Sequence, residues 1–232
     1  MFMRLKPIAL ATAGLLLLLS FSACRTHSTK SQTLIGYGTV KMNHVAVMPF
    51  LPGNTALNAD EQVQPALDCT LMEFCQAVNE LGPGAENVLT GEMQRALELK
   101  LDDRVISLTR GTDVYDNLPQ NRMVDTPRQL ARRFGKTVGA DHVILGSVWR
   151  YRDRMPNAPE IGSSVAFTVY LLEVENGRRV WRGRFDKTQQ ALSDDLRDAD
   201  MFFQEGARWL SAAELARYGI TQVMQTFPEA AE

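Results

Sequence analysis

The sequence predicts an α/β fold: a βαβαβ layer followed by an antiparallel hairpin on the same mixed sheet, with helices at the C-terminal end. Two observations lead to this class. Between residues 44 and 151, short apolar runs alternate with stretches in which apolar residues recur every three or four positions, a pattern typical of helices that cross over a sheet. After residue 163, apolar and polar positions alternate, which is typical of antiparallel strands.

The first strand is expected at residues 44–50, an apolar run that ends before the Pro52-Gly53 turn. Such a run is typical of a central strand that is buried on both faces. After a long connection, a helix is expected at residues 85–101, where apolar side chains recur on one face. Residues 104–108 are expected to form a second short strand, with a polar connection after it.

A second helix is expected to begin at Thr126-Pro127, because threonine caps helix N-termini and proline suits the first helical position. Gly139 is expected to end this helix. Residues 141–151 then form a third apolar run, which we expect to be the third strand of the layer.

The hairpin is expected at residues 164–174 and 180–185, where apolar positions alternate with polar ones. Asn176-Gly177 lies between the two strands. This pair is typical of a tight turn in which both central residues have positive φ, so a short, tight connection is predicted.

Beyond the hairpin the chain is expected to be helical, first at residues 194–203 and then at residues 211–227. Ser211 and Glu214 form a capping-box pattern at the start of the second helix. This helix has one apolar face, which we expect to pack on the domain. Its members are Leu210, Leu215, Ile220, Val223, Met224 and Phe227.

The N-terminal residues resemble the signal sequence of a bacterial lipoprotein. Arg4 and Lys6 precede an apolar block at residues 8–21, which is shorter than the about 20 residues that a spanning helix needs. The small residues before Cys24 resemble the lipobox, although Phe21 stands where the family prefers leucine. The resemblance implies cleavage before Cys24 and its acylation with a diacylglyceryl thioether and an N-terminal acyl chain. The alternative is a secreted protein whose cysteine only happens to follow the cleavage site.

These patterns divide the chain into four parts: a signal peptide at residues 1–23, a flexible tether at residues 24–43, an α/β periplasmic domain at residues 44–190 and a C-terminal helical segment at residues 191–232. Without the signal, 23 basic residues stand against 27 acidic ones, a net charge of −4. This charge argues against nucleic acid as a partner.

Cys69 and Cys75 are candidates for a disulfide, because an exported protein reaches a compartment that permits one. In a continuous helix the pair would be about 9 Å apart along the axis, beyond the about 7 Å that a bridge allows. A bridge therefore requires a loop, which Pro65 and the run Gly82-Pro83-Gly84 favour. The alternatives are two free buried thiols and a metal site.

No enzyme signature is found, since the sequence contains no GxSxG, GxxxxGK[ST], HExxH or GxGxxG motif. We therefore expect no catalytic residues and no cofactor. His27, His44 and His142 are far apart in the sequence, and we expect no metal site. The four aspartates within residues 194–200 are expected on a solvated helix face, with calcium binding as the alternative.

Arginine and aromatic residues gather on two predicted strands, a composition typical of protein interaction surfaces. We interpret them as a candidate interaction surface on one face of the sheet; the alternative is that the arginines only face water. The candidates are Trp149, Arg150, Tyr151, Arg152, Arg182 and Arg184.

Residues 45–50 (VAVMPF) and 139–148 (GADHVILGSV), with the helix between them, resemble a group of envelope lipoproteins. The group comprises the curli-secretion lipoproteins, the lipoprotein activators of penicillin-binding proteins and the N-terminal domain of the Tol system's periplasmic protein. The resemblance implies a non-catalytic α/β domain that binds another envelope protein. Arg25 after the cysteine favours sorting to the outer membrane. The alternative function is a subunit or accessory factor of an outer-membrane secretion or export channel.

Overall fold

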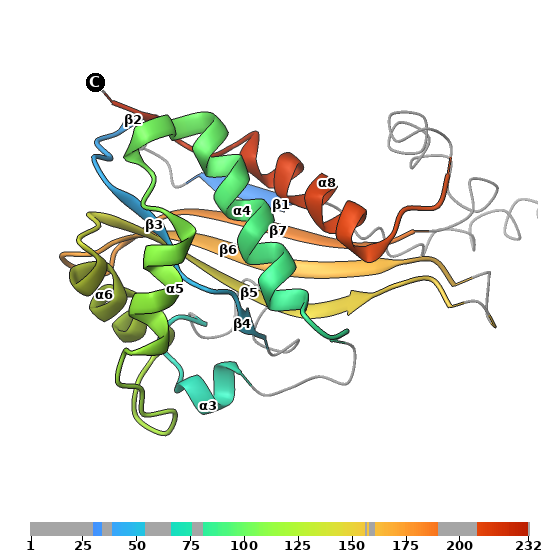
Figure 1. Cartoon of the computed structure of the whole chain (residues 1–232), viewed down its shortest axis with the longest axis horizontal. Helices are drawn as coiled ribbons and strands as arrows, with labels where there is room; N and C mark the ends of the chain where they lie inside the picture. The colour runs from blue at the N-terminus through green and yellow to red at the C-terminus, as the bar shows by residue number, and fades with distance from the viewer. Residues whose placement is uncertain are drawn as a thin grey trace, which may run out of the picture.

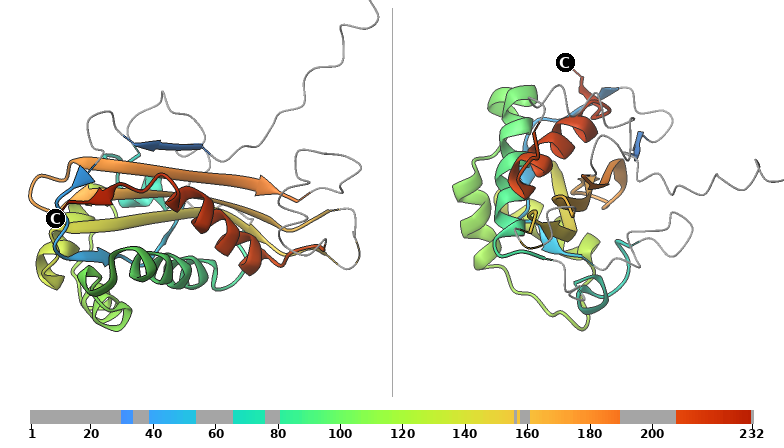
Figure 2. Two further views of the ribbon diagram at one scale, coloured as in Figure 1. Left: turned by 90° about the horizontal axis from the view of Figure 1, so that it is seen from above. Right: turned by 90° about the vertical axis from the view of Figure 1, so that its right-hand side faces the viewer.

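The computed structural model describes residues 30–33, 39–53, 66–75, 81–155, 157, 161–189 and 208–231. A mixed sheet lies at its centre, with helices on both faces (Figures 1 and 2). The predicted α/β class is therefore confirmed. The helix predicted at residues 194–203 and the four aspartates near it lie outside the described residues, as do the signal peptide and His27.

The described strands are β1 (Lys30–Thr33), β2 (Thr39–Val40), β3 (Val45–Val47), β4 (Leu51–Pro52), β5 (His142–Arg152), β6 (Ser164–Glu173), β7 (Arg179–Thr188) and β8 (Glu229–Ala230). The described helices are α3 (Leu71–Phe74), α4 (Ala85–Leu101), the 3-10 helix η2 (Asp102–Arg104), α5 (Leu108–Asp116), α6 (Pro127–Val138) and α8 (Ala212–Met224). The main sheet has the order β1-β7-β6-β5-β3, with β4 also paired to β5, and β2 pairs with β8 separately.

The first predicted strand is buried on both faces, as expected, but it is not central. Val45 and Val47 pack in one core and Ala46 and Met48 in the other. On the side away from β5, the pairing of β3 within the described ranges is an isolated bridge from Val45 to Val105. The apolar run in the sequence therefore indicates that helices bury both faces of this strand. The position of the strand in the sheet depends instead on which distant strands it pairs with.

The strand predicted at residues 104–108 is wrong, since only the bridge at Val105 is formed there. Asp102 adopts a positive φ of 52° and ends α4, and Ser107 is the N-cap of α5. Because η2 occupies Asp102–Arg104, only Val105 and Ile106 remain before Ser107, too few for the predicted five-residue strand. The polar connection predicted after it is also wrong in its first part, because residues 108–116 form α5.

Helices α4 and α6 confirm the local signals in the sequence. Helix α4 has the predicted bounds. In α6, Thr126 and Gln129 form a capping box with Pro127 in the first turn, and Gly139 ends the helix with a φ of 83°. Left-handed backbone of this kind suits glycine because it has no Cβ.

The hairpin of β6 and β7 is confirmed, but its predicted tight turn is wrong. Gly177 has a φ of 73°, whereas Asn176 does not have a positive φ. The Gly177 N–H donates to the Glu173 carbonyl at 2.9 Å, and Arg132 of α6 donates from Nε to the Val174 carbonyl at 3.2 Å. Contacts from α6 thus support a longer connection than the Asn-Gly pair alone predicts.

Helices cover the sheet from both sides. On one face, α4 and α8 pack on an apolar core that includes Ile144, Phe167, Trp181 and Phe185. On the other face, α6 and α3 pack on a second core that includes Val143, Leu145 and Tyr170. Successive residues of a strand point to opposite faces, which is why β5 contributes to both cores.

The ordered domain begins before residue 44, so the predicted boundary of the tether needs correction. Lys30–Thr33 pairs antiparallel with β7, and Thr39–Val40 pairs in parallel with β8. Met42 is only 1% exposed in the core. These pairings join residues 30–40 to strands that lie much later in the chain. The sequence of either segment alone does not indicate that the two pair.

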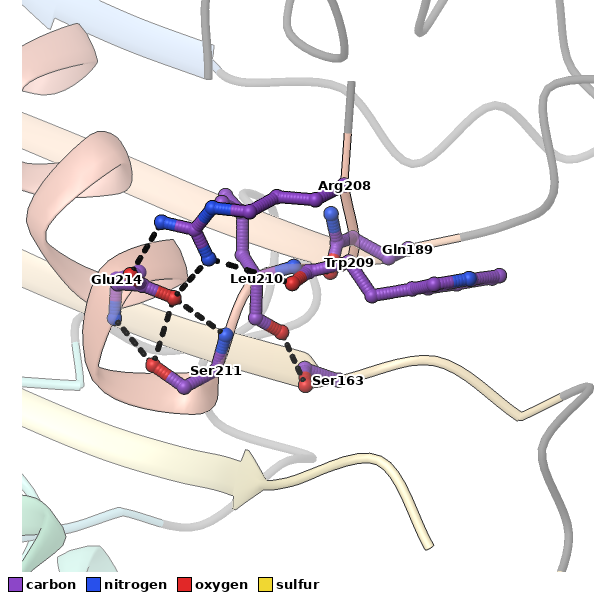
Figure 3. Close-up of polar contacts among 7 residues, drawn as sticks. All are labelled: Ser163, Gln189, Arg208, Trp209, Leu210, Ser211 and Glu214. Atoms are coloured by element: carbon purple, nitrogen blue, oxygen red, sulfur yellow. Dashed lines mark hydrogen bonds and ion pairs between the residues drawn. The ribbon is translucent and has the colours of Figure 1, made fainter. Parts of the chain in front are cut away.

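Helix α8 is joined to the ends of β6 and β7 by the segment before it (Figure 3). The Ser163 hydroxyl donates to the Leu210 carbonyl at 2.7 Å, and the Leu210 N–H donates to the Gln189 side chain at 2.9 Å. The predicted capping box of Ser211 and Glu214 is formed. The C-terminal helix therefore belongs to the domain core.

Gly146 of β5 provides a test of core packing. A Cβ at this position would lie 2.4 Å from ring atoms of Phe50, whose side chain is buried. We expect Gly146→Ala to lower the free energy of unfolding by about 1–3 kcal/mol, as other overpacked cores do. Urea unfolding followed by tryptophan fluorescence measures it. Gly91→Ala in α4 is the control, since an added Cβ there would meet no atom within 4 Å outside its own stretch of helix. This variant should raise the free energy of unfolding by about 0.5–1 kcal/mol.

Glu214 predicts part of the pH dependence of stability. Hydrogen bonds from Arg208, then from Ser211, lower the pKa of Glu214 to about 2. A carboxyl group with a lowered pKa stabilises the fold above its unfolded pKa of about 4.5 and loses that contribution as the pH falls through about 2. Glu214→Gln should therefore be less stable than the unmodified protein at pH 6, with the difference shrinking towards pH 2 in urea unfolding. An equal difference at both pH values would contradict this.

Candidate interaction surface

Polar side chains form a band on one face of the sheet. Helix α6 covers the same face, but at the opposite end of the strands. Residue Arg182 of β7 pairs in register with Tyr170 of β6, and Arg184 pairs with Thr168. Thr168 in turn lies opposite Ser147 of β5. Because directly paired residues share a face, this register brings hydroxyl groups and arginines together on the same side as Tyr170.

One carboxylate serves two arginines in this band. Arg184 Nη2 lies 2.7 Å from Asp186 Oδ2, and Arg150 forms an ion pair with the other oxygen, Oδ1. The three side chains are only 10–16% exposed. Arg150 also donates to the Ser164 hydroxyl. The trio of Arg150, Arg184 and Asp186 therefore has a formal net charge of +1.

Two aromatic rings lie against the arginines of β7. The Arg184 guanidinium is 5.3 Å from the centre of the Trp149 ring, and that of Arg182 is 5.9 Å from the Tyr170 ring. Such stacking stabilises a partly desolvated cation. Trp149 is only 1% exposed.

The six predicted surface residues do not form one exposed patch. Trp149 and Tyr151 are both buried, and Tyr151 packs in the core under α4, on the opposite face from Arg184. A break in register between Val148 and Arg150 disturbs the alternation of β5. Sequence reasoning missed this bulge and also missed Asp186, which decides where Arg150 and Arg184 point.

Cys69 and Cys75 carry free thiols, so the candidate disulfide is not formed. Helix α3 fills the interval where a bridge would require a loop. The Cys69 thiol donates to the Ala66 carbonyl at 3.2 Å. Burial raises the pKa of the Cys75 thiol to about 11 and also raises that of Cys69, so both groups are protonated at neutral pH.

Asp141 joins the first residues of β5 to the segment before β3. Its carboxylate accepts from the Asn43 and His44 backbone N–H groups at 2.8 and 3.2 Å, and His142 Nδ1 lies 3.0 Å away. Burial raises the pKa of Asp141, but these hydrogen bonds outweigh it and hold the pKa below its usual value. Asp141 and the His142 side chain thus hold the start of β5 against the backbone of Asn43 and His44. Across the described residues, no group of histidine, cysteine and acidic side chains is suited to a metal.

A second surface lies between α4 and α8, where a groove of about 420 Å³ is open to solvent. Glu92 holds Arg95 of its own helix at 2.6 Å and Arg217 of α8 at 3.2 Å. Leu99 beside them is 84% exposed. Sequence periodicity did not indicate this groove, because it depends on two helices that are far apart in the chain.

None of the helices in the described ranges has the length and apolar character needed to cross a membrane. This statement concerns those residues alone. The membrane attachment suggested by Cys24 involves a residue outside them.

No family model matches the sequence, and no curated protein matches it. Among solved structures, the chain is similar to the PelC dodecamer from Paraburkholderia phytofirmans, with 15% identity, a TM-score of 0.49, and coverage of 88% of this chain and 100% of that one. It is also similar to the C-terminal domain of LpoB from Salmonella enterica (15% identity, TM-score 0.38, coverage 66% and 86%). A third similar structure is lipoprotein GNA1162 from Neisseria meningitidis (12%, 0.40, coverage 70% and 93%). At these identities and scores, similarity by itself does not indicate a shared activity.

Asp186 provides a test of the arginine network. Asp186→Asn removes the counter-charge from two largely buried guanidinium groups. We expect the free energy of unfolding to fall by about 1.5–3 kcal/mol, the range for hydrogen bonds to charged groups. Urea unfolding measures it. Asp68→Asn is the matched control, because Asp68 pairs with Arg128 but is 47% exposed, and its loss should cost less than about 1 kcal/mol. Equal losses would show that Asp186 is no more important than a surface ion pair.

Proposed function

We propose that this protein is a lipoprotein of the outer membrane whose periplasmic domain binds another envelope protein without catalysing a reaction. The observation that carries the proposal is the N-terminal pattern, in which a basic start and a short apolar block lead to Cys24. Arg25 after the cysteine supports sorting to the outer membrane. The resemblance to lipoproteins implies three acyl chains on Cys24, and one chain alone gives only marginal membrane binding.

The position of β1 supports a function close to the membrane surface. Lys30, the first residue of β1, follows Cys24 by six residues. A fully extended chain of that length spans at most about 20 Å. An acylated Cys24 would therefore hold the β1 edge of the sheet near the lipid headgroups, within reach of other envelope proteins.

The chemistry of the described side chains supports binding as the role of the domain. The polar band on the sheet uses its carboxylate to hold two arginines, and the Cys75 thiol is buried. Arginine stacked on aromatic rings is typical of protein interfaces. We therefore propose a binding role for the domain, in which this largely buried band holds the strands in place and is not itself an exposed patch.

The anchor is tested by Cys24→Ser. We expect this variant to disappear from the outer-membrane fraction, because no thiol remains to accept the diacylglyceryl group. It should be recovered either as soluble protein or as an unprocessed precursor, which membrane fractionation and the mass of the intact chain distinguish. Cys69→Ser is the control and should fractionate as the unmodified protein does. Outer-membrane recovery of Cys24→Ser at the unmodified mature mass would overturn the proposed anchoring.

A further inference from the structure

Three exposed apolar side chains come from two adjoining segments, α3 and the turn at residues 121–125. Met72 is 53% exposed, Met123 71% and Val124 67%. The Met72 N–H donates to the Arg122 carbonyl at 2.8 Å, which joins the two segments. Neighbouring exposed apolar side chains mark sites of protein or membrane contact, whereas scattered ones need no explanation. We call Met72, Met123 and Val124 the apolar patch.

Hydrogen bonds hold the turn in a fixed shape. The Asn121 N–H donates to the Asp125 carboxylate at 2.7 Å, and the Met123 N–H donates to the Asn121 side chain at 3.1 Å. Asp125 also forms an ion pair with Arg133 of α6 at 2.6 Å, and its carbonyl accepts from the Leu71 N–H of α3 at 2.8 Å. Asn121 and Asp125 thus stabilise the turn, while its apolar side chains are exposed. The exposure of the patch is therefore a property of an ordered turn.

The patch lies on the same side of the sheet as the strand next to Cys24. Both views in Figure 2 show α3 and β1 on the side of the sheet away from α4. Lys30 at the start of β1 follows Cys24 by six residues, so an acylated Cys24 lies at most about 20 Å from it. Attachment through Cys24 therefore favours an orientation in which this side of the domain faces lipid.

Charged side chains of both signs flank the patch. Arg122 in the turn and Glu73 on α3 are exposed. Hydrogen bonds from Thr70 hold the pKa of the Glu73 carboxyl below its usual value, so this group is ionised at neutral pH. Because the flanking charges are opposite, contact with a membrane would depend on the apolar side chains more than on anionic headgroups.

We propose that the apolar patch inserts into the headgroup region of the membrane to which Cys24 is attached. This proposal rests on the lipid anchor proposed above and adds a second site of membrane contact. The second contact of a molecule that is already tethered is intramolecular, and short flexible linkers give effective concentrations in the millimolar range. Three apolar side chains therefore suffice, although they would bind a membrane weakly by themselves.

Two contacts with the membrane give the domain a defined orientation. Helices α4 and α8 pack on one face of the sheet, and α3 packs on the other. When the patch contacts lipid, α4 and α8 therefore point into the periplasm. The groove between these two helices then stays open to solvent.

The test uses acylated full-length protein in phosphatidylcholine vesicles, with a tryptophan placed at the patch by Met123→Trp. Lipids with brominated acyl chains quench a tryptophan that enters the membrane. Leu99→Trp is the matched control, since Leu99 is 84% exposed on α4, which packs on the other face of the sheet. We expect the fluorescence added by Met123→Trp to fall at least about twofold, because apolar side chains at an interface lie about 5–10 Å deep. The fluorescence added by Leu99→Trp should not change.

Two further measurements test whether the apolar side chains cause the insertion. Val124→Glu in the Met123→Trp background places a charge in the patch and should abolish the quenching, whereas Leu99→Glu in the same background should leave it unchanged. Both replaced side chains are exposed, so the fold should be retained, which urea unfolding checks. Addition of phosphatidylglycerol should change the quenching less than about twofold, since the flanking charges are of opposite sign.

Flotation of the vesicles separates this proposal from the anchor itself. Protein that does not float with the vesicles has no lipid anchor, and both proposals then fail. If the protein floats but Met123→Trp is quenched no more than Leu99→Trp, the chain is anchored while the patch faces water, a partner protein or a second copy. That result overturns this proposal alone. Quenching that survives Val124→Glu, or that requires phosphatidylglycerol, would also overturn it, because apolar insertion would not be the cause.

Discussion

The structure depends on the pairing of β5 with strands on both of its sides. It is parallel to β3 and β4 on one side and antiparallel to β6 on the other. Most of its residues are buried, and it contributes to the apolar cores on both faces. Parallel pairing requires a long crossover between the strands, so β5 also explains why α4, α5 and α6 lie between β4 and β5 in the chain.

The β7 side of the sheet differs from the β3 side in the chemistry of its side chains. At the β3 side, residues 45–48 are apolar and covered on both faces. At the β7 side, arginines alternate with core residues such as Trp181 and Phe185. One face of β7 thus stabilises α8, while the other gathers positive charge beside an edge that β1 covers over only part of its length. The two faces of β7 therefore differ in chemistry, since one is apolar and the other is polar.

Much of the fold could be predicted where the signals are local. The bounds of α4, the capping boxes of α6 and α8, and Gly139 at the end of α6 all depend on residues within a few positions of one another. Predictions failed where distant residues compete with local preference. Asn176-Gly177 favours a tight turn, but side chains of α6 hold a longer connection. The candidate surface failed similarly, because a carboxylate on β7 binds an arginine of β5.

The sequence by itself determined the α/β class, the main helices and the lipoprotein-like signal, because periodicity, capping chemistry and a signal pattern are properties of contiguous residues. Only the tertiary structure decided three further features: the place of β3 at the side of the sheet, the pairing of β1 with β7, and the burial of Trp149 beneath Arg184. Each of these depends on which strands become neighbours. Strand neighbours are set by hydrogen bonds and burial between residues far apart in the chain, which no local pattern encodes.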